Sequence, residues 1–199
     1  MNFLLFTHIF FGLLALITFP LAIAAKKGSP FHRKAGKYYV FAMTGIFFTA
    51  LLLAFITHNV FLLLISIFSF YLCYSGWRFG HTRTPHIIVD KLGFLLMLPA
   101  SLWMGYKTYV LHSQHDEMGL VLLVFLSISV GLLIADVLYY LGKLSPAQRI
   151  RLHAKKMLGA SVATVTAFCV VNIKSDPAWL AWLAPTICFL PFFIYYNKK

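Results

Sequence analysis

The chain consists of long apolar runs separated by short polar segments, and this pattern constrains its fold more than any other feature. A hydrocarbon layer about 30 Å thick needs roughly 20 apolar residues for each helical crossing. Runs of about that length recur along the whole chain, and only 11% of the residues are charged. In a typical soluble domain, about a quarter of the residues are charged. The sequence therefore predicts an all-α integral membrane protein.

Seven apolar runs are long enough to form transmembrane helices. We expect the helices at about residues 3–25, 38–57, 60–77, 92–111, 119–141, 157–173 and 178–196. The shortest interruption is His58-Asn59, between the second and third runs, which suits a tight helical hairpin. Because all connections are short, we expect residues 1–199 to form a single seven-helix transmembrane bundle.

Cationic residues mark one side of this predicted bundle. Fifteen of the 17 Lys and Arg residues lie in alternate connections and at the carboxyl end: 26–37, 78–91, 142–156 and 197–199. Short cytoplasmic loops are enriched in Lys and Arg. The amino terminus is therefore predicted to lie outside the cytoplasm and the carboxyl terminus inside.

The formal net charge of +12 does not point to nucleic acid. A basic nucleic-acid-binding domain gathers its cations on one solvated face. Here the cations lie between apolar runs, so the expected partner is the lipid bilayer and not nucleic acid.

The first three and the last three runs follow the same order of helices and connections. Both inner connections contain Lys-x-Ser-Pro, at residues 27–30 and 143–146. A parallel three-plus-one-plus-three repeat, with the fourth helix as a linker, is one explanation. Chance similarity of two basic Ser-Pro segments is the other.

Histidine is abundant among the residues that could carry chemistry, with eight copies against five acidic residues. His32 precedes the second predicted span and His153 precedes the sixth. Imidazoles from separate helices at one depth could hold a haem b or a divalent metal ion. These two residues are therefore the leading candidate cofactor ligands. The alternative is that they are interfacial residues that contact lipid headgroups.

Two ionisable residues fall inside predicted spans, His8 in the first and Asp136 in the fifth. Each lies about 7 Å from the nearer membrane edge by helical rise. Ionisable groups at such depth are costly and usually face the bundle interior. His8 is a candidate ligand or a neutral, hydrogen-bonded histidine. Asp136 is a candidate transport residue or the partner of a cation from a neighbouring inner segment.

Further candidates lie near the two membrane surfaces. Arg33 and Asp90 accompany the inner histidines. His112 and His115 are three residues apart and precede two acidic residues, so they are candidate ligands of a divalent metal ion at the outer surface. The alternative is that both are solvated side chains.

Three motifs resemble a family of predicted bacterial membrane proteins catalogued as domain of unknown function 2306. The motifs are HIFFGLLAL (8–16), HRKAGKYY (32–39) and LHAKKM (152–157). The chain departs from the family pattern at Lys156 and Leu158. The resemblance implies a helical protein of the bacterial cytoplasmic (inner) membrane, with no established activity. The candidate site residues that it carries over are His8, His32, Arg33, Gly36, Tyr39 and His153.

Three functions remain open, and none of the usual soluble-enzyme signatures is present to decide whether the chain is an enzyme. The first is a haem- or metal-binding redox or accessory protein with an electron-transfer or membrane-protein partner. The second is a transporter of ions or small molecules around Asp136, and the third is an enzyme that handles lipids. We favour the first, because it uses several histidines at once.

Overall fold

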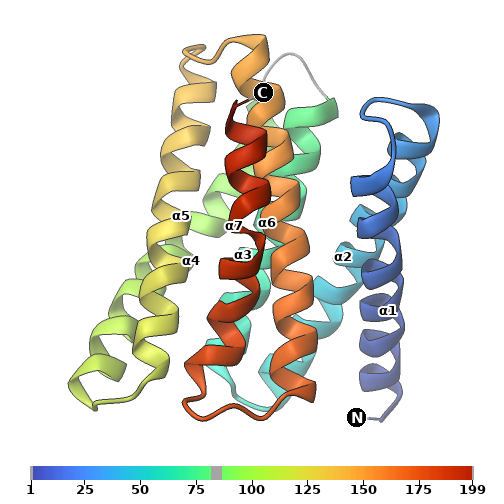
Figure 1. Cartoon of the computed structure of the whole chain (residues 1–199). Coiled ribbons are helices and arrows are strands. Elements are labelled where there is room, and N and C mark those ends of the chain that lie inside the picture. The colour runs from blue at the N-terminus through green and yellow to red at the C-terminus, as the bar shows by residue number, and fades with distance from the viewer. Residues whose placement is uncertain (1, 82–86, 199) are drawn as a thin grey trace.

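The computed structural model contains seven α-helices, as the sequence predicts, and it describes the backbone of residues 2–81 and 87–198 and the side chains of residues 2–81 and 91–195. The helices are α1 (Asn2–Ala24), α2 (Pro30–Ile56), α3 (Val60–His81), α4 (Ile87–Ser113), α5 (Met118–Tyr140), α6 (Pro146–Asn172) and α7 (Trp179–Lys198). They run up and down in one bundle, and the two termini lie at opposite ends (Figure 1). We call the end that holds the α1–α2 and α5–α6 connections the inner end.

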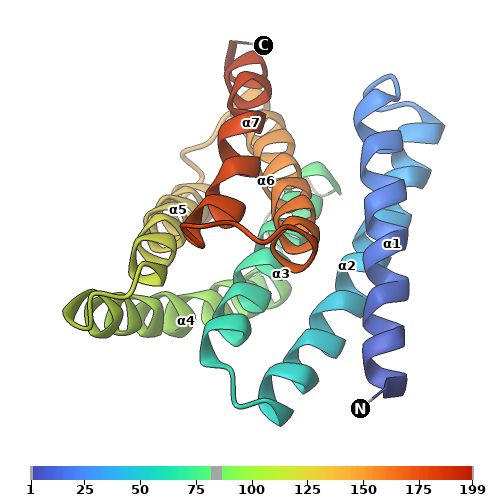
Figure 2. The same cartoon turned by 60° about the horizontal axis from the view of Figure 1, so that its bottom comes forward.

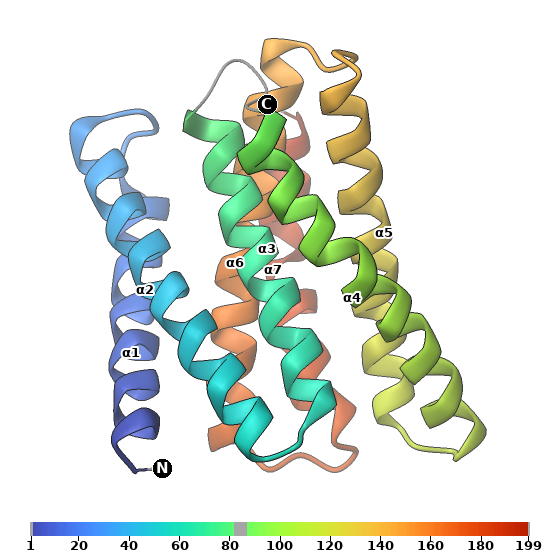
Figure 3. The same cartoon turned by 180° about the vertical axis from the view of Figure 1, so that it is seen from behind.

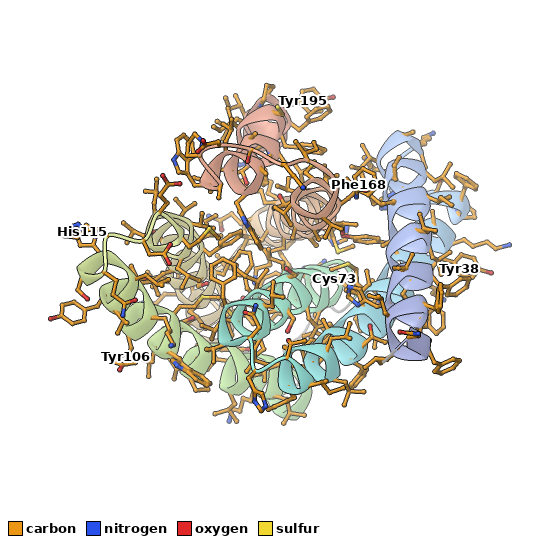
Figure 4. All side chains as sticks on the ribbon, turned by 90° about the horizontal axis from the view of Figure 1, so that it is seen from below. Tyr38, Cys73, Tyr106, His115, Phe168 and Tyr195 are labelled. Atoms are coloured by element: carbon orange, nitrogen blue, oxygen red, sulfur yellow. The ribbon has the colours of Figure 1, made fainter. Side chains whose placement is uncertain are left out.

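The surface of the bundle is apolar, which identifies lipid as its solvent. Leu102 and Tyr106 of α4 expose 70% and 62% of their surface, and many large apolar side chains of the other helices are similarly exposed. Figure 4 shows Tyr38, Tyr106 and Tyr195 at the periphery and Cys73 at the centre. By length and composition, α1, α2, α3, α5 and α6 can each cross a membrane. The prediction of a helical membrane protein is confirmed.

Three helices begin earlier than predicted, because apolarity marks only the part of a helix that lies in hydrocarbon. Helix α2 begins at Pro30 instead of about residue 38, α4 at Ile87 instead of 92, and α6 at Pro146 instead of 157. His32 and His153 consequently lie on helices and not in loops, which fixes their positions more firmly than the sequence implied.

A serine followed by a proline starts both α2 and α6. The Ser29 hydroxyl accepts a hydrogen bond from the backbone N–H of His32, and the Ser145 hydroxyl accepts one from Gln148. Serine at the N-cap satisfies an otherwise open backbone donor, and proline at the first helical position has a suitable φ angle. The two Lys-x-Ser-Pro segments are therefore helix starts.

The proposed repeat gains no support beyond these two helix starts. Helix α1 packs along α2, whereas α5, its counterpart in such a repeat, packs along α4. Aligning the two Ser-Pro pairs also places Gln148, and not His153, opposite His32.

Helix α6 occupies the middle of the bundle, between two hairpins. It packs along α3 and α7 and touches α1. Figures 2 and 3 show the α1–α2 hairpin on one side and the α4–α5 hairpin on the other. Gly159 permits the close approach of α6 to α3, since an added Cβ there would lie 3.2 Å from Cδ2 of Leu72. Small residues allow such close helix packing in membranes.

Candidate functional site

The two leading candidate ligands meet at the inner end of the bundle. His32, in the first turn of α2, and His153, on α6, have ring centroids 6.5 Å apart and ring planes at 85°. Both side chains are half-buried. The structure therefore brings together two imidazoles that are far apart in the sequence.

Backbone carbonyls fix the tautomer of both rings. Nδ1 of His32 lies 2.9 Å from the carbonyl oxygen of Ala22, and Nδ1 of His153 lies 2.7 Å from that of Gly76. A carbonyl only accepts hydrogen bonds, so each Nδ1 carries a proton and each neutral ring keeps its lone pair on Nε2. Neither Nε2 atom is hydrogen-bonded to a described residue. Histidines that bind metals commonly donate their other N–H in this way.

Two glycines of α3 make room for α6, and one of them, Gly80, makes room for the His153 ring. A Cβ added to Gly80 would lie 2.5 Å from Nδ1 and 2.7 Å from Cε1 of His153. A Cβ added to Gly76 would lie 3.0 Å from the backbone nitrogen of Met157. Gly76 and Gly80 are four residues apart on one helix face, the spacing that lets helices approach closely in membranes. We missed this Gly-x-x-x-Gly signal in the sequence.

Asp136 belongs to a second, buried cluster. One carboxylate oxygen accepts from the ammonium group of Lys156 and the other accepts from the hydroxyl of Tyr71. Lys156 is 1% exposed and Asp136 is 3% exposed. The Lys156 ammonium also lies 4.4 Å from the ring centroid of Phe79, within cation–π range.

The pairing of Asp136 with a cation from segment 142–156 confirms one of the two alternatives drawn from the sequence. The role of Tyr71 was missed. It could have been found from the polar residues Tyr71, Ser75 and Arg78, which recur on one face of the otherwise apolar α3.

A small polar cavity of about 10 Å³ adjoins this cluster. It is lined by Tyr71, Tyr74, Ser75, Arg78, Phe79, Asp136, Tyr139 and Tyr140. A polar cavity of that size holds about one water molecule. The space beside Asp136 is therefore too small for a larger solute.

His8 lies away from the inner pair, roughly 20 Å along α1 from the Ala22 carbonyl. Its Nδ1 lies 2.8 Å from Oγ1 of Thr49, whose hydroxyl is 2.7 Å from the carbonyl oxygen of Gly45. Since the Thr49 hydroxyl donates to that carbonyl, it accepts from Nδ1–H of His8. The hydrogen bond joins α1 to α2, as one of the two sequence alternatives predicts.

The remaining inner candidates have different surroundings. Tyr39 is buried, and its hydroxyl lies 3.0 Å from Oγ1 of Thr164, which ties α2 to α6. Arg33 is exposed. Gly36 has open space where a side chain would lie. The side chain of Asp90 falls outside the described residues.

The outer candidates His112 and His115 are both exposed, at the carboxyl end of α4 and in the turn that follows. Figure 4 shows His115 at the edge of the molecule, far from the central Cys73. Among the described side chains, no three His, Cys, Asp or Glu residues lie close enough to hold a metal ion. The outer metal site stays a prediction from the sequence alone.

Comparisons with family models, curated proteins and solved structures give no match, so the family resemblance also stays a prediction from its motifs.

Proposed function

We propose that this membrane protein binds a haem b between His32 and His153 and acts as a membrane redox or accessory protein. In this role it would pass electrons or support the assembly of a respiratory component. The observation that carries the proposal is the pair itself. Two imidazoles from different helices are oriented by backbone carbonyls, so that the neutral form of each ring has its Nε2 lone pair available for a ligand.

The spacing of the rings would allow His32 and His153 to hold one iron together. With metal–nitrogen bonds of about 2 Å, two such imidazoles have ring centroids roughly 6 Å apart. The observed separation is 6.5 Å.

The number of ligands favours haem over a bare metal ion. A protein-bound zinc ion takes three or four protein ligands. The histidine pair supplies two, and the described residues add no third His, Cys, Asp or Glu. A porphyrin brings four nitrogen donors of its own, so its iron would need only His32 and His153 from the protein. A bound haem would supply reversible one-electron chemistry, while the carbonyls of Ala22 and Gly76 would orient the two histidines.

Transport around Asp136 and lipid chemistry at the inner end are the alternatives. Asp136 already has a cation and a hydroxyl as partners, beside space for one water molecule. This arrangement supports a structural role for the acid. We therefore place the transport and lipid hypotheses after haem binding.

The test is an absorption spectrum with metal analysis of protein purified from haem-replete cells. We expect a Soret band and about one iron per chain in the wild type, because the pair provides one bis-histidine site. His32→Ala and His153→Ala should each lose the low-spin spectrum. His112→Ala removes an exposed histidine and is the matched control. A colourless wild-type protein that contains no iron would reject the proposal.

A further inference from the structure

A groove runs between α4 and α5 on the lipid-facing surface of the bundle. Its volume is about 380 Å³, and ten of the described residues line it. Ligand pockets commonly have volumes of about 300–1,000 Å³. The polar residue among the ten is Ser101, at the floor of the groove, and its hydroxyl donates to the carbonyl oxygen of Met97 at 2.9 Å. The groove therefore offers an apolar wall whose one polar side chain is already hydrogen-bonded.

The groove has the length of one lipid chain. Helices α4 and α5 are joined at the outer turn and diverge toward the inner end (Figures 2 and 3). On α5 the groove extends from Leu126, near the middle of the helix, to Leu138 near its inner end, which is roughly 18 Å by helical rise. An acyl chain spans one leaflet, or about half of a hydrocarbon core about 30 Å thick. The dimensions therefore fit an acyl chain of the leaflet at the inner end.

One lysine continues the α4 wall of the groove to the inner end. Lys91 precedes the groove residues Phe94, Leu98 and Leu102, and the four residues follow one another at intervals of three or four. Residues at these intervals share one face of a helix. Lys91 therefore lies at the inner mouth of the groove.

A second lysine lies beside the α5 wall. Helix α5 ends in a turn at Gly142, which has a φ of 67°. This turn brings the backbone nitrogen of Lys143 to 2.9 Å from the carbonyl oxygen of Leu138, a groove residue. Lys143 therefore lies at the same mouth as Lys91.

The inner mouth is positively charged. The two inner connections next to it, 78–91 and 142–156, hold three and five Lys and Arg residues against one acid, Asp90. Lys91 and Lys143 are both exposed, and their long side chains can extend to the level of the lipid headgroups. Lysines at a membrane surface attract anionic lipids. The charge at the mouth therefore complements a negative headgroup.

We propose that this groove binds one acyl chain of an anionic phospholipid, whose phosphate lies against Lys91 and Lys143. A second copy of the chain in the same membrane fits less well, because its own inner connections are basic and would repel the two lysines. The groove belongs to α4 and α5, whereas the histidine pair belongs to α2 and α6. The inference therefore does not depend on haem binding.

The headgroup is tested by native mass spectrometry of the full chain, freed of lipid in detergent and titrated with phosphatidylglycerol or phosphatidylcholine of the same acyl chains. We expect the first phosphatidylglycerol to bind about tenfold more tightly, because choline cancels the phosphate charge that the lysines attract. Lys91→Met combined with Lys143→Met should abolish this preference. Lys26→Met combined with Lys34→Met removes the same charge from exposed positions of the α1–α2 hairpin and should retain it.

The acyl chain is located with phosphatidylglycerol that carries a photoactivatable diazirine in the middle of one chain. We expect cross-links to concentrate on groove residues such as Leu102 and Val130. Ile134→Trp places a larger side chain in the groove and should lower the yield of these cross-links. Leu123→Trp changes an exposed position of α5 that does not line the groove, and it should leave the yield unchanged.

Several outcomes would overturn the inference. These are equal affinity of the wild type for the two lipids, a preference that survives in the variant without Lys91 and Lys143, and cross-links spread evenly over the lipid-facing helices. A dimer that Ile134→Trp dissociates would also overturn it, since a second copy would then occupy the groove. Loss of the preference together with cross-links in the groove supports the inference. Should the lysine variant fail to fold, the map of cross-links on the wild type decides.

Discussion

Lys156 carries a charge into the interior of the bundle, where its side chain is buried. Its ammonium group is bonded to Asp136, and Tyr71 completes the hydrogen bonding of the carboxylate. Removing one partner of a buried ion pair leaves an uncompensated charge, which costs more than the pair itself contributes. Each of the two charged residues is therefore tolerated in the interior only because the other is present.

This dependence predicts a strong coupling between substitutions. Lys156→Met alone should lower the free energy of unfolding by about 3–5 kcal/mol, because Asp136 then loses its counter-charge. Lys156→Met combined with Asp136→Leu should be closer to the wild type than either single variant. The measurement is reversible unfolding in mixed micelles, analysed as a double-mutant cycle.

A suitable control for this cycle is Lys143→Met, at an exposed position. It should change the stability by less than about 0.5 kcal/mol. Additive effects of the two core substitutions would show that the pair is not coupled.

At the residue scale, the sequence named His32 and His153 as a candidate ligand pair and gave a cation partner as one of two alternatives for Asp136. Both predictions rest on where cations and imidazoles fall between apolar runs. The choice of Lys156 and Tyr71 was not predictable, because it depends on the rotation of α3, α5 and α6 about their axes. The alternation of apolar and polar residues is weak in helices that contact lipid on one side and protein on the other, so it does not show which side faces the protein.

At the scale of helices, the contact of α3 with α6 positions the histidine pair. Gly80 leaves room for the His153 ring, and the carbonyl of Gly76 holds its Nδ1. A side chain at Gly80 has to displace either the ring or the whole of α6. The site therefore depends on helix packing as much as on the ligands.

Gly80→Ala should destabilise the protein by about 1–3 kcal/mol, since overpacking forces a close-packed interface apart. It should also break the bond between His153 and Gly76, which ¹⁵N shifts of the imidazole report through its tautomer. Gly36→Ala is the control, because a Cβ there meets nothing within 4 Å. It should be neutral or stabilising by up to about 1 kcal/mol through helix propensity. Equal stability and the same tautomer in both variants would contradict this view of the interface.

The apolar runs predicted all seven helices but not their inner ends. Helices α2 and α6 extend beyond the apolar runs of the sequence. Their additional first turns are polar and follow the N-caps Ser29 and Ser145. The Ser-Pro pairs were noticed as a repeated motif and not as N-caps. Reading them as caps would have placed His32 and His153 on helices from the start.

At the scale of the whole molecule, the bundle places its termini at opposite ends (Figure 1). Seven helices joined by short connections require this, and the cationic segments then share one side of the membrane. The inner position of the histidine pair depends on that orientation.

The orientation predicts which loops a membrane-impermeant thiol reagent can reach. In a variant in which all three native cysteines are replaced by alanine, Gln114→Cys and Lys174→Cys should react from outside intact cells. Lys26→Cys and Lys143→Cys should react only after the membrane is opened, because short loops rich in Lys and Arg stay in the cytoplasm. Labelling of Lys143→Cys and Lys174→Cys from the same side would contradict the topology.

The Asp136–Lys156 bond also sets an order in which the helices can assemble. The chain is made from its amino end, so Tyr71 enters the membrane first, Asp136 follows, and Lys156 comes last. A charged lysine in the interior of a membrane protein is costly unless it is paired. Helix α6 is therefore stable in the bundle only after α3 and α5 supply the Tyr71 hydroxyl and the Asp136 carboxylate. The histidine site includes His153 of α6, so it is completed only at that late step of biosynthesis.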